Sequence, residues 1–454
     1  MRGLREACVV CASKDYAEAV YFKEFLKWTG FSFFIFIFNE HDDKLNEVIA
    51  KDTGTFDFVI YIGDQDGTWE RRFSQQSDVH VHVPVEELWV PQNGKKKPVL
   101  RDDLLVNAWK EIFQEFSPRL SSDSRKVFNK LIQIYCKYNV LHRLASGIYS
   151  MRMLVDKEAE KIKKAEGSLE KTDRYGGWKS IIKCLEDFRE GLIEKQKYDG
   201  MEYLAYALCF CKRKVNEYCN LLKIERTYGT GKVLEQLESV YDYVDDFYMV
   251  ENLKAKISSL DRSYKSFSIS YLLNCTKTCD VNLCNSFHYY RIGKQMEIIQ
   301  REEEAAKAYR ISYMMNPLNF RALFKLAADQ FRRKEWSKSA EYLKGILNIL
   351  QLNTDDDSRF EKQVLFLPPL ELEYVSKCYA LLGRIDEYLG NREEDMVFCY
   401  RRVEQVKQCV RKNKYLSAMY SEVPDWNAFC ECVEERLTKN AIKNKLEKLN
   451  VTCS

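Results

Sequence analysis

Three cysteines and a histidine lie close together in the middle of the chain. Cys275, Cys279, Cys284 and His288 form the pattern C-x3-C-x4-C-x3-H. Thiolate and imidazole groups are the ligands with which proteins hold zinc tetrahedrally, so these residues could close a structural zinc site. Short zinc motifs usually begin with two intervening residues, whereas this pattern has three. Buried or incidental thiols are therefore the favoured interpretation.

Two further patterns contain the residue types of binding chemistry. His80 and His82 alternate with valines, which places both imidazoles on one face of a strand, where a metal would still need a third ligand. Residues 229–232 read Gly-Thr-Gly-Lys, like the end of a phosphate-binding loop. However, Arg226 replaces the first glycine of such a loop, and Val233 stands where it needs Ser or Thr. We expect a solvated strand face and a turn between helices.

The composition limits the broad class of the protein. A length of 454 residues with 46% hydrophobic and 31% charged residues is typical of a soluble protein of two or three domains. Lys plus Arg number 71 and Asp plus Glu 68, so no overall charge favours nucleic acid or an anionic membrane. The first residues become charged too soon for a signal peptide, and the apolar run at residues 31–38 is far shorter than the roughly 20 residues of a membrane helix. We expect a cytoplasmic protein without a cofactor, whose sixteen cysteines are reduced.

A period of 34 residues runs through the C-terminal part. The first clear copy has Tyr289, Ile292, Gly293, Met296, Ala305, Tyr309 and Pro317. The second has, 34 residues later, Leu323, Leu326, Ala327, Gln330, Ser339, Leu343 and Gln351, which keeps the small residues but not the final proline. Small residues recur where helices cross, because packed helix axes lie only about 8–10 Å apart. Tyr379, Leu382 and Gly383 restart the pattern, and Gly383 lies 383 − 327 = 56 positions after Ala327, which is one period plus 22 residues. The aspartates and prolines of residues 351–372 predict a loop for this insertion.

The pattern resembles the tetratricopeptide repeat (TPR), whose copies stack into a helical solenoid and bind peptides in a concave groove. The resemblance implies that inner helices line such a groove with Phe287, Tyr290, Lys294, Glu297, Arg321, Phe324, Ala328 and Phe331. Aromatic anchors beside Lys or Arg suit recognition of a protein or peptide through a few hot spots. The alternative is that some of these aromatic residues are core between repeats.

The rest of the C-terminal two thirds is predicted to be helical. Residues 117–285 begin with a serine-rich linker that offers N-cap residues and then give long helices, including 204–222 and 233–253. They could be degenerate repeats or an adaptor. Residues 286–454 hold the clear repeats and end in a polar capping helix at 439–449.

The first 116 residues alternate strands with helices. The apolar run at residues 33–38 is of the kind that a parallel strand shows when both its faces are covered. Such alternation predicts an α/β domain with a small parallel sheet, as in flavodoxin-like folds. The predicted strands are residues 9–11, 33–38, 56–62 and 79–85, and the predicted helices begin at Asp15, at Lys44 and at Leu104.

Two short stretches of this domain carry a family resemblance. Residues 9–15 read Val-Val-Cys-Ala-Ser-Lys-Asp, and Trp69 follows the apolar strand that ends in residues 58–63. They resemble the first strand and box, and the third strand and following tryptophan, of the Toll/interleukin-1 receptor (TIR) family. The resemblance implies either homotypic assembly in signalling or cleavage of NAD by a glutamate four residues after the tryptophan. Here that position is Phe73, and the nearest carboxylate is Glu70. Since Phe cannot stabilise an oxocarbenium cation, the departure disfavours catalysis.

Two hypotheses follow. In the favoured one, the protein is an intracellular signalling protein whose repeats bind a protein or peptide and whose TIR-like domain transmits the signal by self-association. In the alternative, the TIR-like domain is an NAD glycohydrolase of the defence type, regulated by the repeats. Its catalytic residues would then be Glu70, Ser13 and Asp15, with NAD as the substrate.

Overall fold

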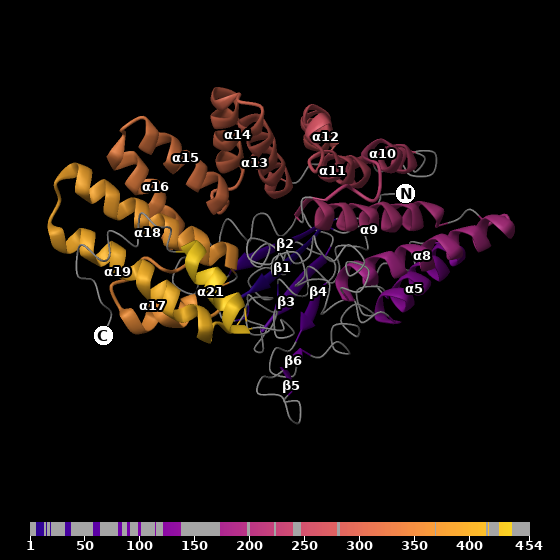
Figure 1. Cartoon of the computed structure of the whole chain (residues 1–454), viewed down its shortest axis with the longest axis horizontal. Helices are drawn as coiled ribbons and strands as arrows, with labels where there is room; N and C mark the ends of the chain where they lie inside the picture. The colour runs from indigo at the N-terminus through magenta and orange to yellow at the C-terminus, as the bar shows by residue number, and fades with distance from the viewer. Residues whose placement is uncertain are drawn as a thin grey trace.

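The computed structural model describes most of the helices and the strands of the N-terminal sheet (Figure 1). The described residues are 6–12, 15, 19, 32–37, 58–63, 80–83, 89–90, 99–100, 114, 121–137, 173–197, 200–221, 224–238, 247–278, 282–367, 369–414, 416 and 426–437.

Four parallel strands form the N-terminal sheet, in the order β2-β1-β3-β4. They are β1 (Glu6–Cys11), β2 (Ser32–Ile37), β3 (Phe58–Ile62) and β4 (His80–Val83). Successive residues of β1 and β3 are fully buried, so both faces of the sheet are covered at these strands. The run at residues 33–38, for which the sequence predicted such coverage, forms β2, whose side chains lie outside the described part. The chain starts in the middle of the sheet, builds one edge and then crosses to the other side, which is the strand order of flavodoxin-like folds. A separate antiparallel pair joins β5 (Trp89–Val90) to β6 (Val99–Leu100).

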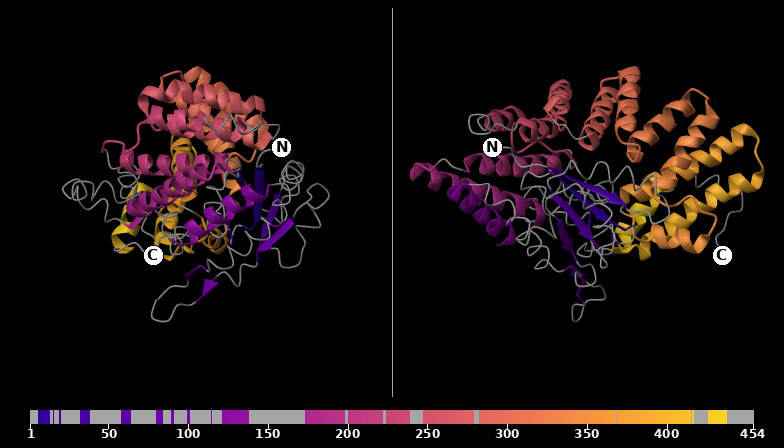
Figure 2. Two further views of the ribbon diagram at one scale, coloured as in Figure 1. Left: turned by 90° about the vertical axis from the view of Figure 1, so that its right-hand side faces the viewer. Right: turned by 180° about the vertical axis from the view of Figure 1, so that it is seen from behind.

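The helices form an arc over this sheet, as Figure 1 and the right-hand view of Figure 2 show. The arc begins with α5 (Ser122–Lys137), α8 (Asp173–Glu194), α9 (Met201–Leu221) and α10 (Thr230–Glu238), which share one hydrophobic cluster. Ser121 caps α5 by accepting a hydrogen bond from the Ser124 amide at 3.1 Å, in the linker where the sequence predicted N-cap residues.

Four helical hairpins continue the arc. They are α11 (Phe247–Ser258) with α12 (Lys265–Thr278), α13 (Asn282–Ile298) with α14 (Glu302–Met315), α15 (Phe320–Arg332) with α16 (Trp336–Ile349), and α18 (Pro369–Leu389) with α19 (Glu393–Cys409). Each hairpin packs on the next, and α21 (Trp426–Leu437) packs on α18 and α19. Side chains of β1 and β3, among them Val9 and Ile60, belong to the same continuous hydrophobic cluster as the C-terminal hairpins.

The 34-residue period is confirmed by the way paired helices touch. A Cβ atom at Gly293 of α13 would lie 2.6 Å from the ring of Tyr309 in α14, so only glycine permits this approach. Gly383 of α18 holds the same place, because a Cβ atom there would lie 3.1 Å from the ring of Tyr400 in α19. The third copy predicted from Gly383 is therefore a real hairpin.

A further copy, for which the sequence offered only the possibility of degenerate repeats, lies at α11 and α12. In the second clear repeat, the buried Ser339 hydroxyl donates to the Ala327 carbonyl at 2.9 Å. The buried Ser268 hydroxyl donates in the same way to the Ala255 carbonyl at 2.9 Å. Both contacts join a small residue of the first helix to a serine of the second at their crossing. The separation along the chain between the alanine and the serine differs by one residue between the two hairpins. This difference hides the 34-residue period in the sequence of α11 and α12.

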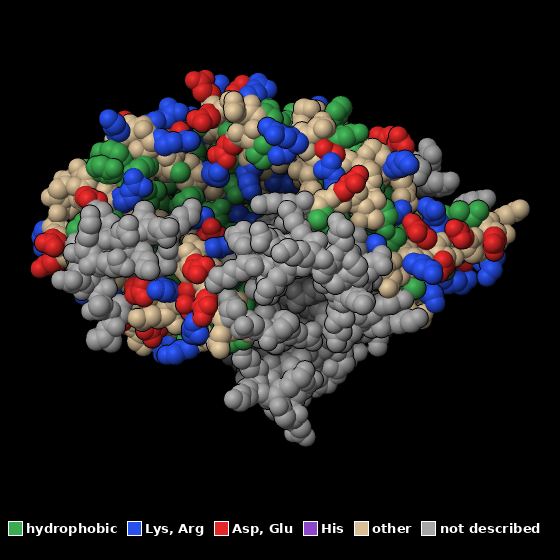
Figure 3. All heavy atoms as spheres, viewed as in Figure 1, with side chains coloured by type: hydrophobic (Ala, Val, Ile, Leu, Met, Phe, Trp, Pro, Cys, Tyr) green, Lys and Arg blue, Asp and Glu red, His purple; other side chains and the backbone are tan. Residues whose placement is uncertain are grey.

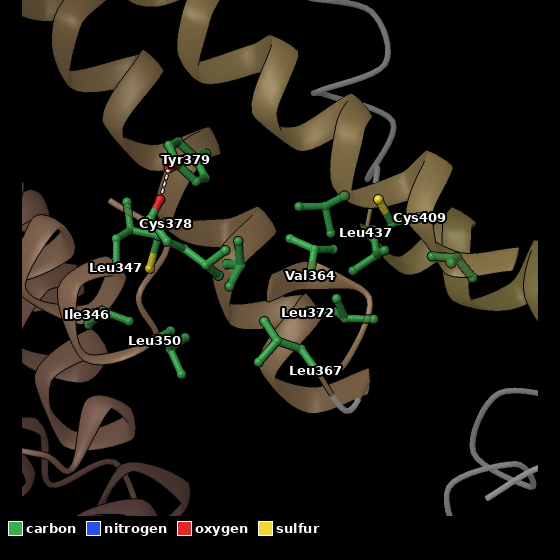
Figure 4. Close-up of a cluster of buried hydrophobic side chains, with 14 of the residues drawn as sticks. Ile346, Leu347, Leu350, Val364, Leu367, Leu372, Cys378, Tyr379, Cys409 and Leu437 are labelled. Carbon is green, nitrogen blue, oxygen red and sulfur yellow. Dashed lines mark hydrogen bonds between the residues drawn. The ribbon is translucent and has the colours of Figure 1, made fainter. Parts of the chain in front are cut away.

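The loop predicted for residues 351–372 is wrong in part, because a helix, α17 (Asp357–Val364), lies within it. The buried guanidinium of Arg402 in α19 donates to Asp357 at 2.7 Å and to the Thr354 carbonyl at 2.8 Å, and it lies 4.3 Å from the centre of the Phe360 ring. Figure 4 shows Val364 and Leu367 of the insertion beside Leu372 and Leu437 in the C-terminal core. The insertion is thus packed into the repeat array.

Two other boundaries differ from expectation. The single helix predicted at residues 233–253 is wrong, since α10 ends at Glu238 and α11 begins at Phe247. The capping helix predicted at residues 439–449 lies outside the described residues. Apart from residues 15, 19 and 114, so do the predicted helices of the first domain, along with most of its loops.

Candidate functional site

The eight predicted groove residues lie on two adjacent inner helices, α13 and α15. Lys294 is exposed, Tyr290 is buried, and the others are partly exposed: Phe287, Glu297, Arg321, Phe324, Ala328 and Phe331. The residues predicted from the sequence therefore lie on one continuous stretch of the repeat array. What each residue does there depends on the neighbouring helix.

Tyr374 of α18 joins the inner helices through aromatic contacts. Its ring meets those of Phe320 and Phe324 edge to face, with centres 5.4 and 5.2 Å away. Its hydroxyl lies 3.4 Å from that of Tyr290. Burial, together with the Tyr290 hydroxyl, raises the pKa of Tyr374, so it stays neutral. Tyr290 and one edge of Phe324 thus belong to the packing between repeats, which was the alternative interpretation of these aromatics.

Two of the predicted charged residues form ion pairs with residues of neighbouring inner helices. Glu297 of α13 accepts a hydrogen bond from Lys325 of α15 at 2.5 Å, and Arg321 of α15 lies 3.7 Å from the buried carboxylate of Glu371 in α18. These pairs fix the spacing of the helices. Within the described chain Lys294 makes no ion pair, so it is the predicted groove cation that remains available to a ligand.

Phe331 lies at the end of α15, in an aromatic group that the sequence analysis missed. We call the group of Phe331, Trp336, Arg384 and Tyr388 the aromatic rim. Phe331 packs against Trp336 with ring centres 4.9 Å apart, Trp336 stacks on Tyr388 at 4.8 Å, and the Arg384 guanidinium lies 5.0 Å from the Phe331 ring centre. Extending the predicted groove offsets into the third repeat would have found Arg384, because it follows Gly383 as Lys294 follows Gly293.

At α11 the inner surface is closed to a ligand. Glu251, Asn252 and Lys254 are all buried. The Lys254 ammonium lies 3.6 Å from the Glu251 carboxylate, and Asn252 accepts a hydrogen bond from Arg291 of α13 at 2.7 Å. The charges here serve packing, since buried charges are stable only when paired. The accessible part of the inner surface runs from α13 to α18.

Of the predicted catalytic residues, only Asp15 is described. It is buried just past the end of β1, and its amide donates to the Ala12 carbonyl at 3.0 Å. Ser13 and Glu70 lie outside the described residues, as do Trp69 and Phe73. In parallel sheets ligands bind beyond the carboxyl ends of the strands where the strand order reverses, here between β1 and β3. Asp15 follows that end of β1.

The predicted zinc ligands are only partly described. Cys275 is buried in α12 and His288 in α13, whereas Cys279 and the side chain of Cys284 lie outside the described part. Burial, with Arg291 and Lys256 nearby, holds the pKa of His288 well below its ordinary value. Among the described residues no three metal-binding side chains gather.

The described cysteines are free and mostly buried. Burial raises the pKa of Cys409 to about 11 and those of Cys209 and Cys399 to about 12. These thiols are protonated at neutral pH, and a thiol must ionise before it attacks or binds a metal. In the fold, these cysteines pack as small apolar side chains.

Residues 229–232 approach the N-terminus of α10, where a phosphate-binding loop would place its anion. A protein carboxylate already lies there. Asp261 accepts a hydrogen bond from the Thr230 hydroxyl at 2.8 Å and pairs with Arg226 at 2.8 Å. The turn between helices that the sequence predicted at residues 229–232 is shorter in the structure, because α10 already begins at Thr230.

Comparison with known proteins adds little to this geometry. No protein-family model matches the chain, and no curated protein matches it. A chain of the solved structure titled "Crystal structure of APC/C hetero-tetramer Cut9-Hcn1" is similar at 10% identity with a TM-score of 0.30, over 76% of this chain and 70% of that one. The hairpins themselves define the class: this is a helical-repeat protein with an N-terminal parallel sheet. Of the helices described, none is long and apolar enough to cross a membrane.

Proposed function

We propose that this protein binds a protein or peptide partner along the inner surface of α13, α15 and α18. The observation that carries the proposal is that the adjacent inner helices α13 and α15 leave Lys294 exposed and Phe324 and Phe331 partly exposed. Rigid aromatic anchors near a cation provide binding energy at small entropic cost. The paired helices hold these side chains on a stacked framework, as in TPR proteins.

A peptide library displayed on phage tests this function on the full-length protein. We expect enriched peptides to bind the wild type and to lose about tenfold in affinity on Lys294→Glu or Phe324→Ala. Met314→Ala, on the exposed outer surface of α14, is the matched control and should leave affinity unchanged. Peptides that bind all these variants equally would place recognition elsewhere.

The N-terminal domain, in this proposal, is TIR-like and transmits binding by self-association. The parallel order β2-β1-β3-β4 supports a flavodoxin-like domain, with which the sequence resemblance is compatible. We expect light scattering to show that the assembly grows when the partner is added. A protein that stays monomeric when its partner is saturating would contradict it.

The second candidate is an NAD glycohydrolase. It is favoured by the burial of Asp15 beyond β1, at the end of the sheet where such folds bind ligands. NAD turnover by the full chain, abolished by Glu70→Ala and reduced by Asp15→Asn, would support it. Absence of turnover even in concentrated assemblies would leave a binding protein alone, as Phe73 at the position of the family's glutamate suggests.

A further inference from the structure

The aromatic rim lies where two hairpins end side by side. Phe331 and Trp336 flank the turn between α15 and α16, and Tyr388 closes α18 just before its turn into α19. Phe331 and Tyr388 are also in contact, with ring centres 6.0 Å apart. Two consecutive repeats therefore build one continuous surface.

This surface exposes large apolar side chains to solvent. Tyr388 is 55% exposed and Leu389, next to it, is 45% exposed, while Trp336 is partly exposed. In Figure 3, hydrophobic side chains reach the surface at the upper left, among Lys and Arg side chains. Stacking between Trp336 and Tyr388, whose planes differ by 9°, holds both rings in place before any ligand arrives. Such preorganised aromatic residues are typical of binding hot spots.

Several Lys and Arg side chains gather around the rim, although the exposed Glu335 and Glu387 also adjoin it. The turn after α15 carries Arg332, Arg333 and Lys334 in succession. Arg332 and Arg333 share the carboxylate of Asp329. In the described part of the chain, neither Lys334 nor Arg384 forms an ion pair, and both are exposed. One face of the Arg384 guanidinium covers Phe331, and its donors remain able to bind an anion.

We propose that the aromatic rim binds an acidic segment of a partner protein that carries a large apolar anchor. The anchor packs on Trp336 and Tyr388, and flanking carboxylates pair with Lys334 and Arg384. The proposal rests on the function proposed above and adds both the place and the chemistry of the ligand. Complementary charge favours an acidic partner over a neutral one, because like charges would repel a basic segment.

Three synthetic peptides and the full-length protein test the proposal by fluorescence anisotropy. The first peptide is rich in Asp and Glu around a central Trp-Leu pair, the second has Ala-Ala in place of that pair, and the third has Lys in place of the acids. We expect the first to bind, and each of the others to bind at least about tenfold more weakly. Equal binding of all three would overturn the proposal.

Substitutions then locate the site. Tyr388→Ala and Arg384→Glu change exposed side chains, so the fold should survive, as far-UV circular dichroism would verify. Each substitution should weaken binding of the first peptide by about tenfold. The controls Arg310→Glu and Met314→Ala, both exposed on α14, should change affinity by less than about twofold. Loss of binding in the controls alone, or in none of the variants, would refute the rim as the site.

Failure of this inference can be told from failure of the proposed function. If library-selected peptides depend on Lys294 and Phe324 but not on Tyr388, the repeats bind a partner and the rim does not contribute. If the acidic anchored peptide does not bind the wild type at all, the rim proposal is wrong whatever the library shows.

Discussion

At the scale of residues, the contact between Gly293 and Tyr309 sets how closely α13 approaches α14. Gly293→Ala would place a Cβ atom 2.6 Å from the tyrosine ring, which must move. We expect a loss of about 2 kcal/mol in unfolding free energy, as is typical of overpacked cores. Urea unfolding monitored by circular dichroism measures it.

Gly191 supplies the matched control for that change. It also lies within a helix, α8, but a Cβ atom there would meet nothing within 4 Å. Gly191→Ala should therefore stabilise the protein by up to about 1 kcal/mol through helix propensity. If both substitutions had the same effect, the close crossing at Gly293 would not be the cause.

His288 predicts a dependence of stability on pH. Its pKa is depressed in the folded protein by burial and by the nearby Arg291 and Lys256, so below its ordinary value of 6.5 the unfolded chain binds a proton that the folded chain does not. Stability is thus fully present above that pH and falls as pH decreases, by at most about 1.4 kcal/mol per pH unit. Comparing urea midpoints of the wild type and His288→Asn between about pH 7 and pH 5 should show a shallower decline in the variant. Identical declines would mean that His288 takes up its proton in the folded state.

At the scale of elements, Arg402 attaches the inserted helix α17 to the repeat array. Arg402→Met removes the hydrogen bonds to Asp357 and Thr354 and leaves the Thr354 carbonyl without this donor. We expect the free energy of unfolding to fall by about 2 kcal/mol. The loss is limited because Asp357 is 64% exposed, so water can replace its hydrogen bond to Arg402. Hydrogen exchange should accelerate over residues 351–367 and stay unchanged in α13 and α14.

The matched control for that element is Arg392→Met at the start of α19. Arg392 is exposed and lies 3.7 Å from Asp395, and such surface pairs contribute little. Faster exchange throughout the array in Arg402→Met would show that the insertion stabilises every repeat rather than itself alone.

At the scale of the whole molecule, the sheet and the hairpins share a hydrophobic cluster although the sequence predicts a boundary near residue 117. We expect a fragment of residues 120–454 to fold, because each hairpin buries its own apolar faces against its neighbours. It should be less stable than the full chain, because apolar side chains that pack against β1 and β3 become exposed. Thermal unfolding followed by circular dichroism would show a lower midpoint with helical content retained. A fragment without cooperative unfolding would contradict the boundary.

The sequence by itself determined the local rules of the fold. The 34-residue period placed Gly293, Ala327 and Gly383 at helix crossings, since a small residue is needed wherever two backbones approach. The apolar run at residues 33–38 indicated a parallel sheet covered on both faces, and the neighbouring strands β1 and β3 are buried in this way. Both inferences depend on which residue types a single element requires, and neither needs knowledge of a distant partner.

Only the tertiary structure decided what the inner surface offers to a ligand. Tyr290 and Glu297 carry the periodicity of groove residues, yet Tyr374 and Lys325 bring them into the packing between helices. Tyr388 and Trp336 are 52 positions apart, 388 − 336, and become neighbours only because the insertion folds away as α17. Sequence spacing records which face of its own helix a residue occupies, whereas exposure depends on what the neighbouring helices bring to that face.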